Sequence, residues 1–343
     1  MWDYIDEQVD VLTNILTQEE KTTSFLPESF VNVNKIIITA SGSSYNAALL
    51  AKTILEKKTT KQILVETPFH FRYYFNLSNQ NENNLLIALS QTGKSIGTLE
   101  CITLAKAKQI PTLALTSDNQ SPIAKKADFH INILCGKESV GPKTKGFSAT
   151  VLVLQLVLMK LLKLNNHDFI NEYKQSISDL PVNIQEAKKW CYHNQSWSKA
   201  QAMSITGFGI NYPTSREGTL KILETMQIPV MNFELEEFMH GPHRTIINDS
   251  YLILINTPAT GNKLMDNLIT FAKSKTKNYL VLSTKKQDDG NVISINDYPL
   301  TDSWLNILVI FQVICTYLPE INGIDSSKPV YQDFATTAGT RIP

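Results

Sequence analysis

The chain has 343 residues, of which 43% are hydrophobic, so it can bury a substantial core in two domains or in one large α/β unit. Its 32 basic and 32 acidic residues cancel, which argues against nucleic acid or an anionic membrane surface as the main partner. The N-terminus, MWDYIDEQVDVL, lacks the basic start and the apolar core of a signal peptide.

The four cysteines and six histidines are dispersed, without CxxC or HExxH spacing. We therefore expect no zinc site, no disulfide framework, no metal and no cofactor, and a reducing, cytoplasmic location. The most apolar stretches, 151–159 and 307–318, are shorter than the roughly 20 residues that span a bilayer. We expect both to be core helices.

In chain order, residues 1–34 predict a helix followed by a polar loop. Short apolar strands that alternate with helical patterns come next, at 35–40, 62–67, 85–90, 112–117 and 131–134. Continuous apolar strands indicate a parallel sheet, because its strands are covered on both faces. A long apolar helix, 147–164, closes this half.

Residues 165–200 predict a polar helix pair with a break at Pro181. The alternation then restarts with a strand and turn at 203–210, a helix at 214–227, a strand at 251–256, a helix at 263–273, a strand at 279–284 and a last apolar helix at 304–318. The polar tail that follows shows no clear periodicity.

We predict an α/β fold with two similar three-layer αβα lobes, each around a central parallel sheet of the doubly wound, flavodoxin-like kind. The expected domains are a lead-in at 1–34, a first lobe at 35–165, connecting helices at 166–200, a second lobe at 201–320 and a tail at 321–343.

Two hydroxyl-rich turns, ASGSSYN and LSQTGKS, each connect a predicted strand to a helix. Parallel strands bind ligands at their carboxyl ends, and free N–H groups at a helix start attract anions. The candidate phosphate-binding residues are Gly42, Ser43, Ser44, Ser90, Gln91, Thr92, Gly93 and Ser95. Neither turn has GxGxxG or GxxxxGK[ST], which favours a small phosphate ester over a nucleotide. The alternative is that these hydroxyls only cap helices.

The predicted helix TSREGTLKILETMQ carries Glu217, Lys221 and Glu224 within about 60° of one another on one face. A solvated face with an ion pair is one interpretation. A lysine beside carboxylates in a cleft, where it would tune a glutamate for proton transfer, is the other. His240 and His243 follow shortly, and histidine performs acid–base chemistry near neutral pH.

Several ordered motifs across about residues 35–330 resemble the sugar isomerase (SIS) superfamily, and most closely the isomerase half of glucosamine-6-phosphate synthase. They are ASGSSYNAALLAK, VETPFHFRYY, LSQTGKS, ESVGPKTKGFSAT and REGTLKILETMQIPVMNFELEEFMHGP. The last is the most specific, because Glu, Lys, Glu and His all fall at the family's spacing. Two residues of the fourth motif, Glu138 and Lys145, are further candidates for the site.

The resemblance implies that the hydroxyl turns grip a sugar phosphate. It makes Glu224 the base that moves a proton between C1 and C2, and Lys221 a support for substrate hydroxyls. It also implies that His240 is offered by a neighbouring subunit to assist ring opening, so a homodimer with a shared site is expected.

Two departures from the synthase matter. This sequence starts MWDY and not with the synthase's cysteine nucleophile, so we expect no glutaminase domain. No lysine follows Lys328, Thr336 falls near the place of the synthase's tail lysine, and Arg341 cannot form a Schiff base. We therefore expect a phosphosugar isomerase, amino-sugar-phosphate deaminase or fructosamine-6-phosphate deglycase rather than a glutamine-dependent synthase. The alternative is a non-catalytic protein that binds and senses a sugar phosphate.

Overall fold

The computed structural model describes residues 1–77, 83–257 and 262–342. The chain folds into two compact units, each assembled from segments that are not continuous in sequence. The N-terminal unit comprises Asp10–Ser139, Lys145–Asp168 and Pro329–Pro343. The C-terminal unit comprises Met1–Val9, Val140–Thr144 and Phe169–Lys328. The predicted bounds of the two lobes, 35–165 and 201–320, stay predictions.

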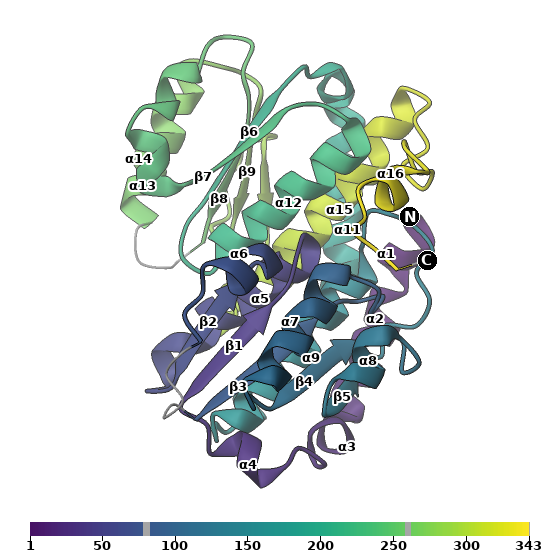
Figure 1. The fold of residues 1–343 in the computed structure, drawn as a ribbon. Coiled ribbons are helices and arrows are strands. Elements are labelled where there is room, and N and C mark those ends of the chain that lie inside the picture. Colours follow the sequence, from purple (N-terminus) through teal and green to yellow (C-terminus); the bar gives the residue numbers. More distant parts are fainter. Residues whose placement is uncertain (78–82, 258–261, 343) are drawn as a thin grey trace. The chain divides into compact units, whose positions relative to one another are not determined.

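The N-terminal unit is built on a five-stranded, all-parallel sheet in the order β2-β1-β3-β4-β5 (Figure 1). The strands are β1 (Lys35–Thr39), β2 (Gln62–Glu66), β3 (Asn84–Leu89), β4 (Thr112–Thr116) and β5 (Phe129–Asn132). This is the flavodoxin-like order, in which the chain direction across the sheet switches between β1 and β3. The fifth strand lies two residues earlier than its predicted range.

Helices cover both faces of this sheet. They are α5 (Ser43–Leu55), η1 (Glu56–Lys58), α6 (Pro68–Tyr73), α7 (Ile96–Ala107), α8 (Pro122–Lys126) and α9 (Lys145–Leu161). Ile37 and Leu86 pack against α6 and α7, whereas alternate strand residues such as Ile36 and Ile87 point to the opposite face and are equally buried. The predicted three-layer arrangement is confirmed.

The first 34 residues differ from the prediction of one helix and a polar loop. They form four short helices, α1 (Trp2–Asp6), α2 (Gln8–Thr17), α3 (Glu19–Thr23) and α4 (Glu28–Val31). The polar composition hid these helices, because scattered residues such as Leu26 and Phe30 are buried between exposed ones. The opposite end of the chain adds α16 (Phe334–Thr337) to the same unit as α3 and α4.

The C-terminal unit repeats the topology with the parallel order β7-β6-β8-β9-β10, so the predicted duplication is confirmed. Its strands are β6 (Met203–Gly207), β7 (Val230–Glu234), β8 (Tyr251–Asn256), β9 (Tyr279–Ser283) and β10 (Val292–Ser294). The sequence prediction missed two of them. β7 is a half-exposed edge strand without a continuous apolar run, and β10 has only three residues.

Besides α1, the helices of this unit are α10 (His167–Ser178), α11 (Leu180–His193), η2 (Gln195–Lys199), α12 (Asn211–Met226), α13 (Leu235–Met239), η3 (Pro242–Thr245), α14 (Asn262–Lys273) and α15 (Trp304–Ile321). The break predicted at Pro181 lies at Asp179, two residues earlier, because a proline fits the first turn of α11. α12 approaches α15 closely at Gly218, where an added Cβ would lie 2.6 Å from the Phe311 ring.

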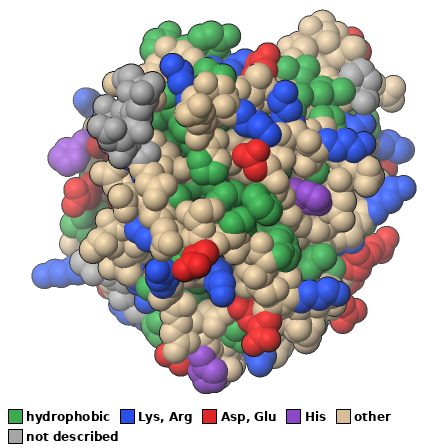
Figure 2. Space-filling view, turned by 60° about the horizontal axis from the view of Figure 1, so that its bottom comes forward, with side chains coloured by type: hydrophobic (Ala, Val, Ile, Leu, Met, Phe, Trp, Pro, Cys, Tyr) green, Lys and Arg blue, Asp and Glu red, His purple; other side chains and the backbone are tan. Residues whose placement is uncertain are grey.

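By length and composition, α15 could cross a membrane, and it is the only such helix within the described ranges. Its hydropathic window is 83% buried inside the protein, as in the core helix of a globular unit. α15 packs against α11 and α12, and its Gln312 accepts a hydrogen bond of 2.7 Å from Gln8. The surface in Figure 2 carries interspersed acidic and basic side chains, in keeping with the zero net charge.

A buried carboxyl group precedes α15. Asp302 and Ser303 both have left-handed backbone angles, with φ of 51° and 55°. The backbone carbonyl of Asp302 accepts a hydrogen bond of 2.8 Å from Asn211 at the start of α12. Burial raises the pKa of Asp302 from 3.8 to about 6, and hydrogen bonds from Thr257 and Asn211 offset this only in part. The folded protein therefore binds this proton more tightly than the unfolded chain does.

The free energy of unfolding should consequently fall as the pH rises. The stabilisation that comes from the protonated Asp302 is fully present below pH 3.8 and is lost as the pH rises through about 6. We expect Asp302→Asn to raise the free energy of unfolding at pH 7.5 by at most about 3 kcal/mol, with the gain shrinking toward pH 4. Urea titrations at three pH values measure it. Because asparagine also suits a left-handed backbone, a pH-independent gain would contradict the linkage. Asp288→Asn, at an exposed position, is the control.

Candidate active site

The two hydroxyl-rich turns lie side by side, because β1 and β3 are adjacent parallel strands and each turn follows one of them. They occupy the switch point of the N-terminal sheet, where doubly wound folds bind ligands. Helices α5 and α7 begin directly after them, so two sets of unpaired N–H groups point toward the same edge of the sheet. The sequence placed each turn on a strand end, and the sheet order brings the two together.

The first turn starts α5 with Gly42 as its N-cap. The Gly42 carbonyl accepts hydrogen bonds from the backbone of Tyr45 at 2.9 Å and of Asn46 at 3.1 Å. Ser43 and Ser44 are the first two residues of the helix, and neither acts as its side-chain cap. Their half-buried hydroxyls therefore accompany the N-terminal N–H groups of α5. An anion at this place would meet partial positive charge and hydroxyl donors together.

The second turn runs from Ser90, buried at the end of β3, to Ser95, the N-cap of α7. Gly93 has a φ of +65°, and an added Cβ would lie 2.2 Å from the Ser121 hydroxyl. The Ser95 hydroxyl accepts hydrogen bonds from the amide of Thr98 at 3.4 Å and from its hydroxyl at 3.0 Å. Ser95 therefore is a helix cap, and its own proton remains able to serve a ligand.

Ser44, Ser90 and Thr92 make no side-chain hydrogen bond to other residues that the structure describes. Two residues that the sequence analysis did not single out hold the turn in place. Thr116 and Ser117, at the end of β4, donate hydroxyl hydrogen bonds of 3.1 and 2.7 Å to the Gln91 carbonyl. Their position at the end of a strand predicted at 112–117 was the available signal. The two hydrogen bonds connect the backbone of the turn to the end of β4.

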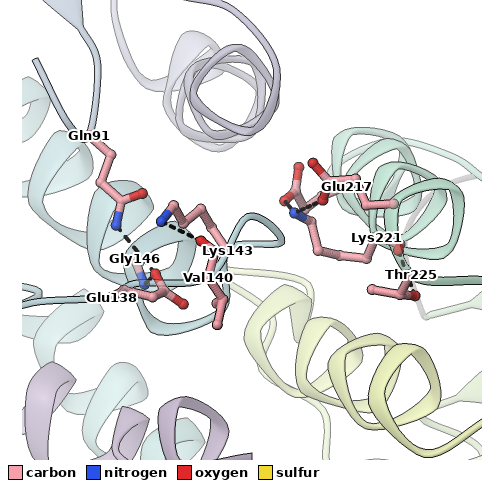
Figure 3. Close-up of polar contacts among 9 residues, drawn as sticks. Gln91, Glu138, Val140, Lys143, Gly146, Glu217, Lys221 and Thr225 are labelled. Atoms are coloured by element: carbon pink, nitrogen blue, oxygen red, sulfur yellow. Dashed lines mark hydrogen bonds and ion pairs between the residues drawn. The ribbon is translucent and has the colours of Figure 1, made fainter. Parts of the chain in front are cut away.

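The Gln91 side chain faces Glu138, as Figure 3 shows. Its amide nitrogen donates to a Glu138 carboxylate oxygen at 3.3 Å and to the Cys135 sulfur at 3.6 Å. The same carboxylate oxygen accepts the backbone N–H of Gly146 at 3.1 Å. A Cβ at Gly146 would lie 1.9 Å from the Gln91 amide nitrogen, so a larger residue there would displace the paired side chains of Gln91 and Glu138. A contact between this amide and a phosphate requires the amide to give up one of these partners.

On α12, Lys221 lies between two carboxylates (Figure 3). Its ammonium nitrogen is 3.4 Å from Glu217 and 2.6 Å from Glu224. The Lys221 and Glu217 side chains are 1% and 0% exposed, whereas Glu224 is 34% exposed. The interpretation of this row as a solvated face is therefore wrong for Glu217 and Lys221. α15 packs against α12 and covers them, whereas the apolar Leu223 of the same helix is 40% exposed.

The electrostatics of the row favour a charged lysine. Burial alone would lower the pKa of Lys221, but Glu217 and Glu224 outweigh it and the pKa is raised. The ammonium group therefore stays protonated and holds one oxygen of Glu224 by a charge-assisted hydrogen bond. Glu224 is the member of the row that solvent can reach. A fixed, partly exposed carboxylate is what a proton-transferring base requires.

His240 lies at the end of α13 and is exposed. Its backbone N–H donates to Glu237 at 3.2 Å, and no hydrogen bond joins it to Glu224 or Lys221 in the part of the chain that the structure describes. The imidazole of the nearby His243 accepts the backbone N–H of Gly241 at 3.4 Å. A role for His240 in another subunit's site stays a prediction.

Across residues 1–77, 83–257 and 262–342, no three His, Cys, Asp or Glu side chains are arranged to hold a metal ion. The four cysteines are free and buried. Lys145, the other candidate of its motif, is the first residue of α9 and is 4% exposed. An added Cβ at Gly136 would lie 3.8 Å from its amine. The amine is thus close to the loop that carries Glu138.

Comparison with known proteins gives one family and a consistent set of relatives. Residues 29–160 match the family model described as SIS domain. The glutamine–fructose-6-phosphate aminotransferase (isomerizing) of Thermococcus kodakarensis is 25% identical over 95% of this chain and 56% of its own length. The chain thus spans about half the length of the curated relatives it matches.

Two solved structures share the fold. The C-terminal domain of glucosamine-fructose-6-phosphate aminotransferase from Francisella tularensis has a TM-score of 0.84 at 20% identity, over 96% of this chain and 98% of that one. The tagatose-6-phosphate ketose/aldose isomerase from Escherichia coli has a TM-score of 0.74 at 14% identity, over 96% and 95%. At these identities the likeness concerns the arrangement of the two sheets and their helices.

Proposed function

Since the chain contains an SIS domain, we propose that it is an enzyme that acts on a 6-phosphorylated ketose, amino sugar or fructosamine. In this proposal Glu224 moves a proton between C1 and C2 of the open sugar. The observation that carries it is the buried row on α12, in which Lys221 fixes the one carboxylate that solvent can reach. A buried lysine that links two carboxylates, one of which solvent can reach, is typical of a catalytic site.

The phosphate of the substrate would be held by the two turns of the N-terminal unit. The starts of α5 and α7 supply N–H groups, and Ser43, Ser44, Ser90, Thr92 and Ser95 supply hydroxyl donors. Hydroxyls and helix starts bind the dianion without enclosing a nucleoside. This end of the substrate would be an anchor, because a phosphate six carbons along the sugar takes no part in chemistry at C1 and C2.

For the reaction itself, the Glu224 carboxylate would take the proton from the carbon next to the carbonyl while the carbonyl oxygen gains a proton, which forms an enediol. It would then give the proton to the neighbouring carbon while the other enediol hydroxyl loses its proton, which completes an aldose–ketose interconversion. Lys221 would keep the carboxylate oriented, and His240 would assist ring opening. With an amine on the substrate, the same first transfer would precede loss of the amine.

Incubation in deuterated water with fructose-6-phosphate, glucosamine-6-phosphate and a fructosamine-6-phosphate tests this proposal. We expect at least one of them to incorporate deuterium at C1 or C2, as seen by proton NMR, and the unphosphorylated sugars to exchange far more slowly. Tight binding of a phosphosugar without exchange or turnover would contradict the enzyme and favour the sensing alternative. Release of ammonia or of a free amine would separate deaminase and deglycase from isomerase.

We further propose that the protein works in the cytoplasm as a homodimer whose subunits share the site. Four free, buried cysteines support a reducing compartment. Support for sharing comes from His240, which is exposed at the end of α13 and is therefore available to a second copy of the chain. Such a site would be incomplete in a monomer, so activity should fall on dilution below the dimer's dissociation constant.

A further inference from the structure

The tail returns to the phosphate turn. Helix α16 ends in a paired motif in which Thr340 donates its backbone N–H to Ala335 at 3.1 Å and Gly339 donates to Thr336 at 3.2 Å. Gly339 has a φ of 61°, as this helix ending requires. The chain then turns back, and its residues 340–342 run along residues 94–96 of the turn between β3 and α7.

The contact is an antiparallel bridge between Ser95 and Arg341. Ile96 donates its backbone N–H to Thr340 at 3.2 Å, and Ile342 donates to Lys94 at 2.9 Å. In this pattern Ser95 and Arg341 form the non-hydrogen-bonded pair of the ladder, whose side chains project to the same side with Cβ atoms about 4.5–5.5 Å apart. The neighbouring side chains of Lys94 and Ile96 project to the opposite side, because side chains alternate along an extended chain.

Arg341 therefore lies beside the hydroxyl that caps the start of α7. A cation at a helix start is unfavourable, since the N-terminal N–H groups already carry partial positive charge. None of the described carboxylates forms an ion pair with Arg341, which is exposed. A bound anion would remove this repulsion and be attracted by the guanidinium and the helix start together.

We propose that Arg341 is a ligand of the substrate's phosphate group, supplied by the tail. The inference rests on the proposed function, and it adds to the hydroxyl turns a positive side chain that projects to the same side as Ser95. A guanidinium suits this role because its fork of N–H donors matches two phosphate oxygens, whereas hydroxyls contribute single, uncharged hydrogen bonds. The tail thereby contributes to substrate binding through the charge of Arg341, and not through a covalent Schiff base of the kind that a tail lysine can form.

The test uses the full chain and measures the dissociation constants of inorganic phosphate and of fructose-6-phosphate by titration calorimetry. Arg341→Gln should weaken both by about 10- to 100-fold, which corresponds to loss of one or two charged hydrogen bonds. Arg341→Lys should restore part of the loss. Lys94→Gln is the matched control. It removes the same charge one residue from the bridge, on the opposite side, and should change binding less than twofold.

In turnover assays, Arg341→Gln should raise KM for a phosphorylated substrate and leave kcat within about twofold, because the contact is equally present before and in the transition state. Unchanged phosphate binding in Arg341→Gln would overturn the inference, and so would an equal loss in Lys94→Gln. Circular dichroism checks that each variant is folded. Since phosphate binding is measured without turnover, the inference can hold when no phosphosugar reacts, and it can fail in an active enzyme.

Discussion

Replacing Glu224 with glutamine should lower kcat by about 10²- to 10⁴-fold, the usual contribution of a general base. Glutamine retains an oxygen that can accept the hydrogen bond of 2.6 Å from Lys221, so the side chain should keep its position and lose only its basicity. Binding of phosphate and of the substrate should stay within about threefold of the wild type, because the altered group acts on C1 and C2. Deuterium exchange at C1 and C2 measures the proton transfer directly.

Glu237→Gln provides the control, since Glu237 is an exposed carboxylate of the same unit. Retention of wild-type exchange in Glu224→Gln would contradict the assignment of the base. The shared site can be tested with the same variant. Mixing inactive Glu224→Gln and His240→Ala proteins should restore about a quarter of the wild-type activity if each site takes these residues from different subunits. If both residues come from one chain, mixing restores nothing.

Replacing Lys221 with methionine should lower the free energy of unfolding by about 3–5 kcal/mol, the typical result of removing one partner of a buried ion pair. Methionine has a similar length, so the loss arises from charge and not from a cavity. Glu217, whose side chain is 0% exposed, would be left as a buried carboxylate without its ammonium partner. Urea unfolding followed by circular dichroism measures the change.

The double variant Lys221→Met, Glu217→Gln separates this cause from loss of packing. Because it removes both buried charges, it should recover most of the stability lost in Lys221→Met. Activity should stay low in both variants, since neither holds Glu224 by an ammonium group. A double variant no more stable than Lys221→Met would show that the charge on Glu217 is not the cause.

The strands that were predicted well from the sequence are those that a pattern within the strand itself identifies. β1, β3 and β4 are continuous apolar runs, and burial on both faces makes such runs readable without knowledge of their neighbours. β7 lies at the sheet edge and mixes exposed with half-buried residues, so no local pattern identified it. The parallel, doubly wound kind of sheet was predicted from the alternation of strands with helices.

In the candidate site, too, local features were predicted from the sequence and long-range contacts were not. The turns at Gly42 and Gly93 were visible, because strand, small residues and helix follow one another in the sequence. The burial of Lys221 could not be predicted from the sequence, because helical periodicity shows which residues share a face but not which element packs against that face. The element that packs there is α15, which lies some 90 residues away in the chain. It can approach α12 closely because residue 218 is a glycine. The pairing of Gln91 with Glu138 is likewise a long-range contact, 47 residues apart. The catalytic and phosphate-binding roles stay predictions.

The exchange of terminal segments between the two units has a consequence for biosynthesis. The C-terminal unit contains Met1–Val9, and the N-terminal unit contains Pro329–Pro343. The first residues emerge from the ribosome long before their partner helix α15, since Gln8 and Gln312 are 304 positions apart. The turn that ends at Ser95 is made early, but its bridge to Arg341 can form only after the whole second sheet has been translated. Domains usually fold in order during synthesis. A chain that stops before Arg341 could therefore form most of the N-terminal sheet while lacking the residue that we propose as a phosphate ligand.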